Sequence, residues 1–394
     1  MDTQRLRFKG INGVEFPEWK KTSIEDLFDV SAGGDLDKDH FSHFKDDKHV
    51  YPIYANALTN GGLFGYSTKY TVAEKSITVT GRGEVGHATA RDGKYTPIVR
   101  LLVCKPKNNQ NTKFFEEAIN RTNIVIESTG VPQLTVPQLK RIILPVPSLP
   151  EQQKIADFLS SYDEKISIQR ERVEALERRK KGLLQKVFSQ ELRFKADDGS
   201  EYPEWKEELL NELSEYITVG IANSATQAYR KDGVAMFRNQ NIHENYLDDS
   251  DVLHIEESFE KKYWKKRLKT NDILVTRTGN PGIACLVPQK YEGAQTFTTL
   301  IVRLHTEGLV PAYICQFINS KEGKKYISST QIGGGQKNSG AAILEKMPIK
   351  IPCYQEQQKI AAFFTVIDDQ INIEKERLTT METIKKGLLQ GIFC

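Results

Sequence analysis

The chain has 394 residues, which is too long for one ordinary core, so two or three domains are expected. Charged residues make up 27% of it and the formal net charge is only +3, which excludes a dominating field but leaves room for a basic face that binds nucleic acid. No run of about 18 apolar residues and no cleavage-like start occurs, and the five cysteines form no CxxC pair; this composition is typical of a reducing cytoplasm.

The first feature in chain order is a segment that occurs twice. Residues 4–20 read QRLRFKGINGVEFPEWK, and residues 190–206 read QELRFKADDGSEYPEWK. Ten identical residues recur between Leu6 and Lys20 at a constant offset of 186 positions. We therefore expect two copies of one module, with copy one ending near residue 189.

A stretch of mixed pattern follows each PEWK. In copy one, TSIEDLFDV predicts a short helix capped by Thr22 or Ser23. Strand-like runs follow near 50–56, 75–83 and 96–104, and NTKFFEEAIN predicts a second helix. Copy two has the corresponding strand-like runs near 234–242, 271–282 and 297–305, and VPAYICQFINS predicts the corresponding helix. In both copies one strand leads into a glycine-broken turn, TGRGEVG or TRTGNPG.

Each copy closes on a proline-free stretch with a regular apolar pattern, at 152–188 and 357–393. In both, apolar residues recur at alternating steps of four and three, which is the period of a coiled-coil seam. The first seam is Ile155, Leu159, Tyr162, Ile166, Val173, Leu176, Leu183 and Val187. The second is Ile360, Phe364, Ile367, Ile371, Leu378, Met381, Leu388 and Ile392. A helix of this length, roughly 57 Å at 1.5 Å per residue, needs a partner, and the obvious partner is its own copy.

Both seams are interrupted at the same two places. Gln169 matches Glu374 and Lys180 matches Lys385, each 205 positions apart. Such polar positions either fix the register of a helix pair or mark a short solvent-exposed stretch. A glycine also recurs, as Gly182 and Gly387, and because glycine destabilises a helix it suggests close approach of another backbone.

The order of the repeats is circular. The LRFK segment follows directly on the first long helix, whereas the chain stops as the second long helix ends and instead begins with an LRFK. We therefore expect Leu6 and Phe8 to dock at the end of the second helix as Leu192 and Phe194 dock after the first. Two repeats that close in this way predict a pseudo-two-fold axis and antiparallel long helices.

Together, the PEW segments, the glycine-broken turns, the EQQKIA helix starts and the closing KKGLLQ resemble the specificity subunit of a Type I restriction–modification enzyme. The resemblance covers essentially the whole chain. It implies a mixed α/β fold, in which two target recognition domains, 1–148 and 190–352, are joined by an antiparallel coiled coil of conserved helices, 149–189 and 353–394. It further implies that each domain reads half of a split double-stranded DNA target while the helices set the gap.

The resemblance also implies partners and cofactors. Two modification subunits carrying S-adenosylmethionine would dock on the helices, and restriction subunits with ATP and Mg²⁺ would join them, while this chain itself would hold no cofactor and no metal. The segments that lead into the long helices differ modestly, PSLPEQQKIA against PCYQEQQKIA, and the glycine-broken turns differ from each other, which fits different half-sites.

Base reading needs Arg or Lys for guanine and Asn or Gln for adenine, on loops or element ends. In copy one the candidates are Tyr54, Asn56, Asn60, Lys69, Arg82, His87, Thr129 and Gln133. In copy two they are Arg238, Asn239, Gln240, Asn241, Arg277, Thr278, Asn280, Gln336, Lys337, Asn338 and Ser339. The basic run KKYWKKRLK, residues 261–269, suits phosphate contacts or is an exposed helix face.

No pattern supports catalysis. The sequence contains no GxSxG, HExxH, P-loop or GxGxxG, and the acidic run at 34–43 lacks the spacing of a calcium loop. We therefore interpret the chain as a non-enzymatic DNA-recognition subunit. Two alternatives stay open: a self-contained endonuclease with a duplicated recognition domain, for which the ExK at Glu18–Lys20 and Glu204–Lys206 is the only hint, and a coiled-coil scaffold without DNA affinity.

Overall fold

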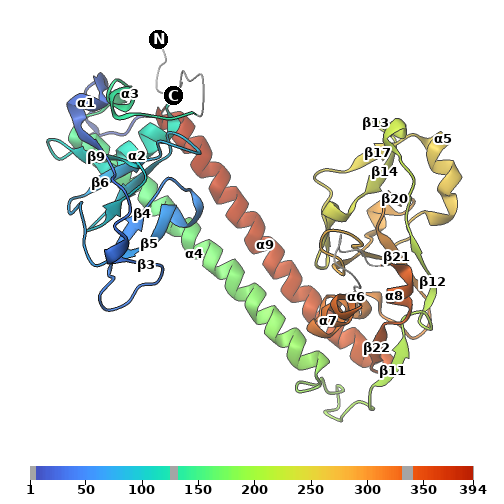
Figure 1. The fold of residues 1–394 in the computed structure, drawn as a ribbon. Coiled ribbons are helices and arrows are strands. Elements are labelled where there is room, and N and C mark those ends of the chain that lie inside the picture. Colours follow the sequence, from blue (N-terminus) through green and yellow to red (C-terminus); the bar gives the residue numbers. More distant parts are fainter. Residues whose placement is uncertain (1–5, 125–131, 331–339, 394) are drawn as a thin grey trace. The chain divides into compact units, whose positions relative to one another are not determined.

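The structure, a computed structural model, describes residues 6–124, 132–330 and 340–393. The chain divides into two compact units (Figure 1): unit 1 comprises 1–169 and 377–394, and unit 2 comprises 170–376. Both units combine β-sheets with helices, so the expected mixed α/β fold is confirmed.

Unit 1 contains two four-stranded sheets and one two-stranded sheet. The strand orders are β2-β9-β6-β7, β3-β5-β4-β8 and β1-β10. The strands are β1 (Lys20–Ser23), β2 (Phe28–Ala32), β3 (Phe41–Ser42), β4 (Tyr51–Tyr54), β5 (Leu63–Ser67), β6 (Ser76–Val79), β7 (Ala88–Arg91), β8 (Thr96–Pro97), β9 (Leu102–Pro106) and β10 (Ile143–Val146). The helices are α1 (Ile24–Leu27), α2 (Thr112–Arg121) and α3 (Val136–Lys140), with 3₁₀ turns η1 (Ile11–Gly13), η2 (Lys38–His40) and η3 (Thr59–Gly62).

Local sequence explains these elements. Ser23 caps α1 by accepting a hydrogen bond from the Asp26 amide, as predicted, and Asn111 caps α2 by accepting from the amides of Lys113 and Phe114. The predicted strand 96–104 is in fact two strands, β8 and β9, because Val99 and Arg100 between them adopt positive φ angles of 53° and 61°.

Unit 2 repeats the strand orders of unit 1, as β12-β21-β18-β19, β13-β17-β14-β20 and β11-β22. Its strands are β11 (Lys206–Leu209), β12 (Ser214–Val219), β13 (Tyr229–Arg230), β14 (Val234–Phe237), β15 (Ile242–His243), β16 (Tyr246–Leu247), β17 (Leu253–Ile255), β18 (Ile273–Val275), β19 (Ala284–Leu286), β20 (Gln295–Thr296), β21 (Leu300–Leu304) and β22 (Pro348–Ile351). Its helices are α5 (Glu257–Glu260), α6 (Pro311–Asn319), α7 (Lys321–Ser329) and α8 (Ala341–Glu345), with 3₁₀ turns η4 (Thr226–Ala228), η5 (Asn239–Asn241), η6 (Lys261–Lys266) and η7 (Gln289–Tyr291).

Two helices of 40 residues each, α4 (Leu149–Phe188) and α9 (Tyr354–Phe393), contribute to both units. In unit 1, Ile155 and Leu159 of α4 share a buried core with Leu389 and Ile392 of α9. In unit 2, Val187 and Phe188 of α4 share a core with Ile360 and Phe364 of α9. Within each unit, therefore, the beginning of one helix packs beside the end of the other.

The predicted seam is buried at nine of its 16 positions and half-buried at the other seven, and near the carboxyl end of each helix a neighbouring residue is buried instead. Leu184 is buried to 6% exposure where Leu183 was expected, and Leu389 is buried to 3% where Leu388 was expected. Leu183 and Leu388 are only half-buried. In both helices the burial thus shifts by one residue near the carboxyl end, where the globular part of the unit also packs against the helix.

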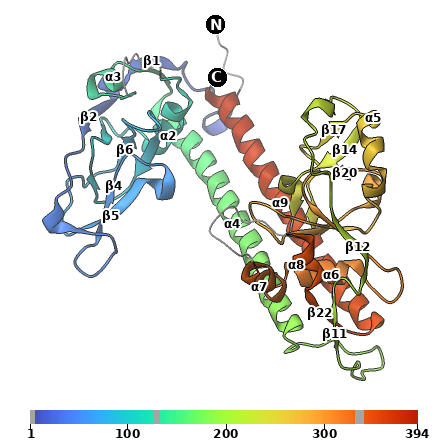
Figure 2. The ribbon, with the colours of Figure 1, turned by 45° about the vertical axis from the view of Figure 1, so that its right-hand side comes forward.

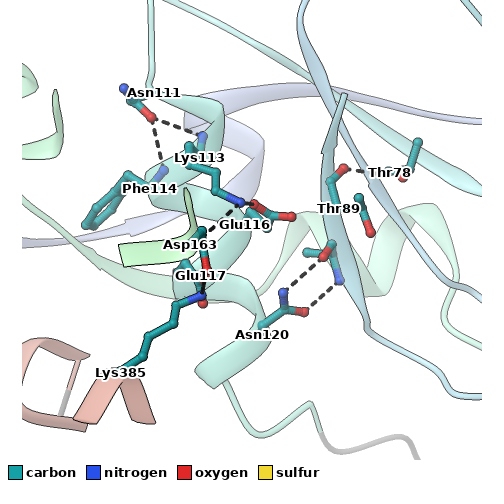
Figure 3. A network of polar contacts seen from close by, with 11 residues as sticks. Thr78, Thr89, Asn111, Lys113, Phe114, Glu116, Glu117, Asn120, Asp163 and Lys385 are labelled. Carbon is teal, nitrogen blue, oxygen red and sulfur yellow. Dashed lines mark hydrogen bonds and ion pairs between the residues drawn. The ribbon is translucent and has the colours of Figure 1, made fainter. Parts of the chain in front are cut away.

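Three of the four polar positions of the seam, Lys180, Lys385 and Glu374, hold ion pairs, and the fourth, Gln169, is half-buried. Lys180, only 7% exposed, donates to Asp368 in unit 2. In unit 1, the Nζ of Lys385 lies 2.5 Å from Asp163 Oδ1 and 3.2 Å from Glu117 Oε1 (Figure 3). Burial by itself would lower the pKa of Lys385, but the hydrogen bond to Asp163 and the charge of Glu117 outweigh it and raise that pKa.

The amino-terminal segment docks as predicted from the circular order of the repeats. The Leu6 amide donates to the Gly391 carbonyl at 3.1 Å, and the Leu192 amide donates to the Lys186 carbonyl at 3.0 Å. The rings of Phe8 and Phe158 lie 5.3 Å apart, and those of Phe194 and Phe363 lie 5.4 Å apart. Each unit therefore uses the same contacts to join an LRFK segment to the long helices.

Candidate nucleic-acid interface

The glycine-broken turn of unit 1 connects β6 to β7 and is held in a fixed shape by Thr80. The Thr80 hydroxyl accepts from the His87 amide at 2.9 Å and donates to the Glu84 carbonyl, while the Gly86 amide donates to the Thr80 carbonyl at 2.8 Å. Gly86 has φ +88° and a Cβ there would lie 2.9 Å from Ile124 Cδ1, so this position requires glycine. Arg82, Glu84 and His87 are exposed on the turn.

Unit 2 builds the turn between β18 and β19 in the same way. The Thr276 hydroxyl accepts from the Ile283 amide at 2.9 Å and donates to the Asn280 carbonyl at 2.7 Å, and the Gly282 amide donates to the Thr276 carbonyl at 3.0 Å. The scaffold is therefore common to both units, whereas its outward side chains are not: Arg82 and His87 in unit 1 against Arg277 and Asn280 in unit 2.

An asparagine from a neighbouring loop braces each turn. In unit 1, Asn56 Oδ1 accepts from the Gly81 amide at 2.7 Å, and its Nδ2 donates to the Val99 carbonyl at 2.6 Å. In unit 2, Asn239 Oδ1 accepts from the Arg277 amide at 2.9 Å, and its Nδ2 donates to the hydroxyls of Thr278 and Thr298 at 3.1 and 3.3 Å. These amides are engaged within the chain, so both asparagines position the turn.

The same braces hold a strained backbone. Val99 has φ 53° and Thr298 has φ 57°, and both are β-branched residues, which rarely adopt the left-handed conformation. Strain of this kind costs on the order of 1–3 kcal/mol and persists only where the surroundings impose it. Its recurrence at the matched position of both units indicates that the shape of this loop cluster serves a function.

Three of the remaining candidates of unit 1, Tyr54, Asn60 and Lys69, lie on one sheet and its loops, whereas Gln133 lies just before α3. Asn60 and Lys69 are exposed at opposite ends of β5, and Gln133 is half-buried. Tyr54 is covered by the guanidinium of Arg91, 3.7 Å from its ring centroid, and Arg91 also donates to the Gly61 carbonyl at 2.6 Å. Burial is the main cause that lowers the pKa of Arg91. Thr129 lies outside the described residues.

In unit 2, three candidates converge on one acidic loop. Arg238 Nη2 and Gln240 Nε2 donate to Asp251 Oδ2 at 2.8 and 2.9 Å. Asn241 is 1% exposed and donates to the Asp248 and Asp251 carbonyls at 3.1 and 3.0 Å, so it organises the loop from inside. Gln336, Lys337, Asn338 and Ser339 lie outside the described residues.

The sequence patterns did not reveal the residues that hold the turns and the candidate side chains in position. Thr80 and Thr276 stand at the same position of the two turns, 196 residues apart, and that recurrence was a signal available in the sequence. Arg91 and Asp251 gave no such signal, because their partners are distant in the chain. Among the described residues, no cluster of three His, Cys, Asp or Glu side chains could hold a metal ion, and no helix is long and apolar enough to cross a membrane.

Comparison with known proteins gives concordant matches. The model of the family described as the type I restriction modification DNA specificity domain matches residues 17–178 and 202–383. A Mycoplasma pneumoniae protein named as a type I specificity subunit is 36% identical over 143 residues, which cover 36% of this chain. The chain spans only 39% of the length of that relative.

Longer matches are more distant. The specificity subunit of the Escherichia coli type I restriction enzyme EcoBI is 22% identical over 421 aligned positions, covering 96% of this chain and 87% of that protein. The crystal structure of the S subunit of a type I restriction–modification system from M. genitalium covers 100% of this chain and 99% of that one, with a TM-score of 0.64 and 15% identity. This last likeness shows a shared fold.

Proposed function

Because this chain belongs to the type I restriction modification DNA specificity family, whose model matches both of its repeats, we propose that it is the DNA-reading subunit of such a system. Each unit reads one half of a bipartite target in double-stranded DNA, and the chain performs no chemistry itself. It directs partner subunits to that target, where they methylate or cleave the DNA.

One observation carries this proposal: the two units bear the same braced turn with different exposed side chains. Asn56 and Asn239 hold the turns, and Arg82 and Arg277 stand at neighbouring positions of them. Phosphate contacts position a protein on DNA, whereas base contacts specify the sequence. A constant scaffold with variable side chains is what two readers of different half-sites require.

The candidates divide by their contacts. Asn56, Asn239 and Asn241 position the loops, because they are half-buried or buried and their amides are engaged within the chain, whereas Gln240 is exposed although it bonds to Asp251. We propose Arg82, His87 and Asn60 as base readers in unit 1, and Arg277, Asn280 and Gln240 in unit 2, because these side chains are exposed or half-exposed on loops. The roles of Lys69, Tyr54, Thr278 and Arg238 and of the candidates outside the described residues stay predictions.

We propose that α4 and α9 form an antiparallel coiled coil, related by a pseudo-two-fold axis, that fixes the gap between the half-sites. The matched pairs Lys180–Asp368 and Lys385–Asp163 support this, because polar pairs placed at seam positions fix the register of a helix pair. Two modification subunits carrying S-adenosylmethionine dock on the helices, restriction subunits with ATP and Mg²⁺ join them, and the complex works in the cytoplasm. These partners rest on family membership.

The experiment is a methylome comparison. Cells that carry the modification subunit with this chain should methylate adenine in a bipartite motif, and cells without the chain should not. Arg82→Ala should relax or abolish recognition in one half of the motif, and Arg277→Ala in the other half. Loss of both halves in each variant would contradict independent reading, and Mg²⁺-dependent cleavage by the purified chain alone would favour an endonuclease.

A second arm tests the helices as a spacer. Inserting four residues after Glu174, in the exposed part of α4, should lengthen the gap of the methylated motif and leave both halves unchanged. A motif with an unchanged gap would contradict the role of the helices.

A further inference from the structure

Unit 2 carries an insertion that unit 1 lacks. Residues 256–272 connect β17 to β18, whereas eight residues, 68–75, connect the matched strands β5 and β6 of unit 1. The insertion folds into α5 and η6, and α5 lies beside β14, β17 and β20 (Figure 2).

One side of the insertion is anchored to unit 2 through Glu260, which is 1% exposed. Arg267 donates to both oxygens of Glu260 at 2.7 and 2.6 Å, and Gln295 Nε2 donates to it at 2.8 Å. The hydrogen bond from Arg267 is the main cause that lowers the pKa of Glu260, so this anchor is charged at neutral pH.

A second anchor is Lys266, whose Nζ donates to the carbonyls of Val219 and Gly220 at 2.7 and 2.9 Å. Phe259 and Tyr263 pack against the small core that contains Ile221 and Met236. These contacts fix the insertion as a platform, and they involve neither the indole of Trp264 nor the ammonium group of Lys265.

The other side presents four side chains to solvent: Lys261, Lys262, Trp264 and Lys265, which we call the Trp264 patch. Trp264 is 60% exposed, and Lys265 Nζ lies 5.6 Å from its ring centroid. All three lysines of the patch are exposed. A large aromatic side chain held in water contributes little to folding, and here it stands beside three exposed lysines, where it is available to a ligand.

The charge of the insertion identifies that ligand. Residues 256–272 contain six basic and four acidic residues, and three of the acids are paired with arginines: Glu256 with Arg230, Glu260 with Arg267 and Asp272 with Arg303. Lysines are depleted in the cores of protein–protein interfaces, whereas lysines beside an aromatic face are typical of nucleic-acid contacts, with cations on phosphates and the ring on a sugar or base.

The platform shares an anchor with the reading turn of unit 2. Gln295 bonds to Glu260 of the insertion, and three residues later Thr298 accepts from Asn239, which braces Arg277. Both features are thus fixed to one short segment, 295–298. We propose that the Trp264 patch binds the sugar–phosphate backbone of duplex DNA next to the half-site that unit 2 reads. This inference rests on the proposed function and adds a sequence-independent contact found on one unit.

The test measures DNA binding of the full chain assembled with its modification subunits. The variant Lys261→Gln/Lys262→Gln/Lys265→Gln removes three phosphate contacts, so the slope of log affinity against log salt should become shallower by about 3. Affinity at physiological salt should fall on the order of 10- to 100-fold, and equally for the target and for a target with one altered base pair.

Two further variants sharpen this test. Trp264→Ala should remove hydroxyl-radical protection of a few sugars beside the unit 2 half-site, leaving protection beside the unit 1 half-site unchanged. As a matched control, Lys206→Gln/Lys321→Gln/Lys325→Gln removes three exposed lysines of β11 and α7 and should leave the salt slope unchanged. Equal urea midpoints for all variants establish that folding is intact.

The outcomes separate this inference from the proposed function. A wild-type complex without sequence-specific binding would overturn the proposed function itself. Specific wild-type binding with an unchanged salt slope in the triple-lysine variant would overturn only the role of the Trp264 patch. Impaired assembly with the modification subunit, with DNA affinity of the full chain unchanged, would identify the patch as a protein-docking surface and overturn the DNA contact.

Discussion

In unit 1, eight residues, 43–50, connect β3 to β4, whereas three residues, 231–233, connect the matched strands β13 and β14 of unit 2. After the following strand the difference reverses, because unit 2 has the insertion 256–272 and unit 1 has 68–75. Each unit therefore extends the same sheet with a different loop. The inner contacts do not vary in this way.

The constant inner contacts are side-chain amides bonded to backbone. Asn120 accepts from the Ala88 amide at 2.8 Å and donates to its carbonyl at 3.0 Å, and Asn319 does the same for Ala284, at 2.8 Å in both cases. The turn braces Asn56 and Asn239 behave alike. The comparison teaches that the module keeps the asparagines that hold its turns and strands and varies its loops, as a pair of readers for different half-sites should.

The largest expected difference between the units lies in the buried carboxylates in the first turns of α4 and α9. Glu356 accepts from Arg193 at 2.7 Å and from Trp205 Nε1 at 2.9 Å, whereas its counterpart Glu151 accepts from Arg7 at 3.3 Å. Both carboxylates are fully buried. Arg193→Met should therefore lower the free energy of unfolding by about 3–5 kcal/mol, because it removes the cation that compensates a buried carboxylate and leaves it only the bond from Trp205.

Arg7→Met should cost at least as much although its contact is longer, because Glu151 has no bond from Trp19 to replace it, whereas Glu356 keeps its bond from Trp205. Urea unfolding of the full chain checks this pair of variants. A clearly smaller loss in Arg7→Met than in Arg193→Met would contradict this order.

The turn braces give the next largest effect. Asn56→Ala and Asn239→Ala should each cost about 1–3 kcal/mol, because each leaves a buried turn amide unsatisfied, and each should weaken binding of its own half-site at least tenfold. Competition with DNA altered in one half or the other is the measurement. Gln240→Ala is the control on stability: it removes a proposed base reader but leaves the Arg277 amide bonded to Asn239, so it should weaken binding of the unit 2 half-site without this loss of unfolding free energy. A brace variant that weakens both half-sites equally would contradict independent scaffolds.

The helix ion pairs differ between the units and predict a pH dependence. The folded-state pKa of Lys385 is raised, so its stabilising contribution is present at neutral pH and is lost as pH rises through that pKa. The difference in unfolding free energy between the wild type and Lys385→Met, about 1 kcal/mol at pH 8, should therefore shrink above roughly pH 10.4.

Glu117→Gln sharpens this prediction, because unit 2 has Gln316 at the matched place, where it donates to Asp368 at 2.7 Å. The substitution should move the alkaline loss to lower pH, as measured by urea unfolding at several pH values. If the difference in unfolding free energy between the wild type and Lys385→Met grew with rising pH, the ion pair of Lys385 would not be the stabilising contact.

The smallest expected effect is stabilising. Gly182 and Gly387 lie in exposed helix positions, and a Cβ at either would meet no atom of the described chain within 4 Å. Gly182→Ala and Gly387→Ala should each raise the free energy of unfolding by about 1 kcal/mol. If the glycines allow the backbone of a partner subunit to approach closely, as the sequence suggests, the same variants should weaken assembly with the modification subunits. If assembly were unimpaired, the close approach of a partner backbone would be contradicted, and the variants would act only on the stability of the helices.

The sequence by itself determined the repeat, its circular order and the positions of the main elements. Apolar side chains recur with a period of two in a strand and of about 3.6 in a helix, so neighbouring residues alone indicate these elements. The docking of Leu6 at the end of α9 followed from the offset between the repeats. The break of β8 from β9 at Val99 was not visible, because the strain there is imposed by a side chain, Asn56, from another loop.

Only the tertiary structure decided what the polar residues do. Lys180 and Lys385 could be located as breaks in the seam, but their partners Asp368, Asp163 and Glu117 come from distant segments. In the same way, Asn56 and Asn239 have the side chains of base readers, yet their amides are bonded inside the chain. A polar side chain satisfies its hydrogen bonds wherever the fold brings a partner, and that choice is made across the chain rather than along it.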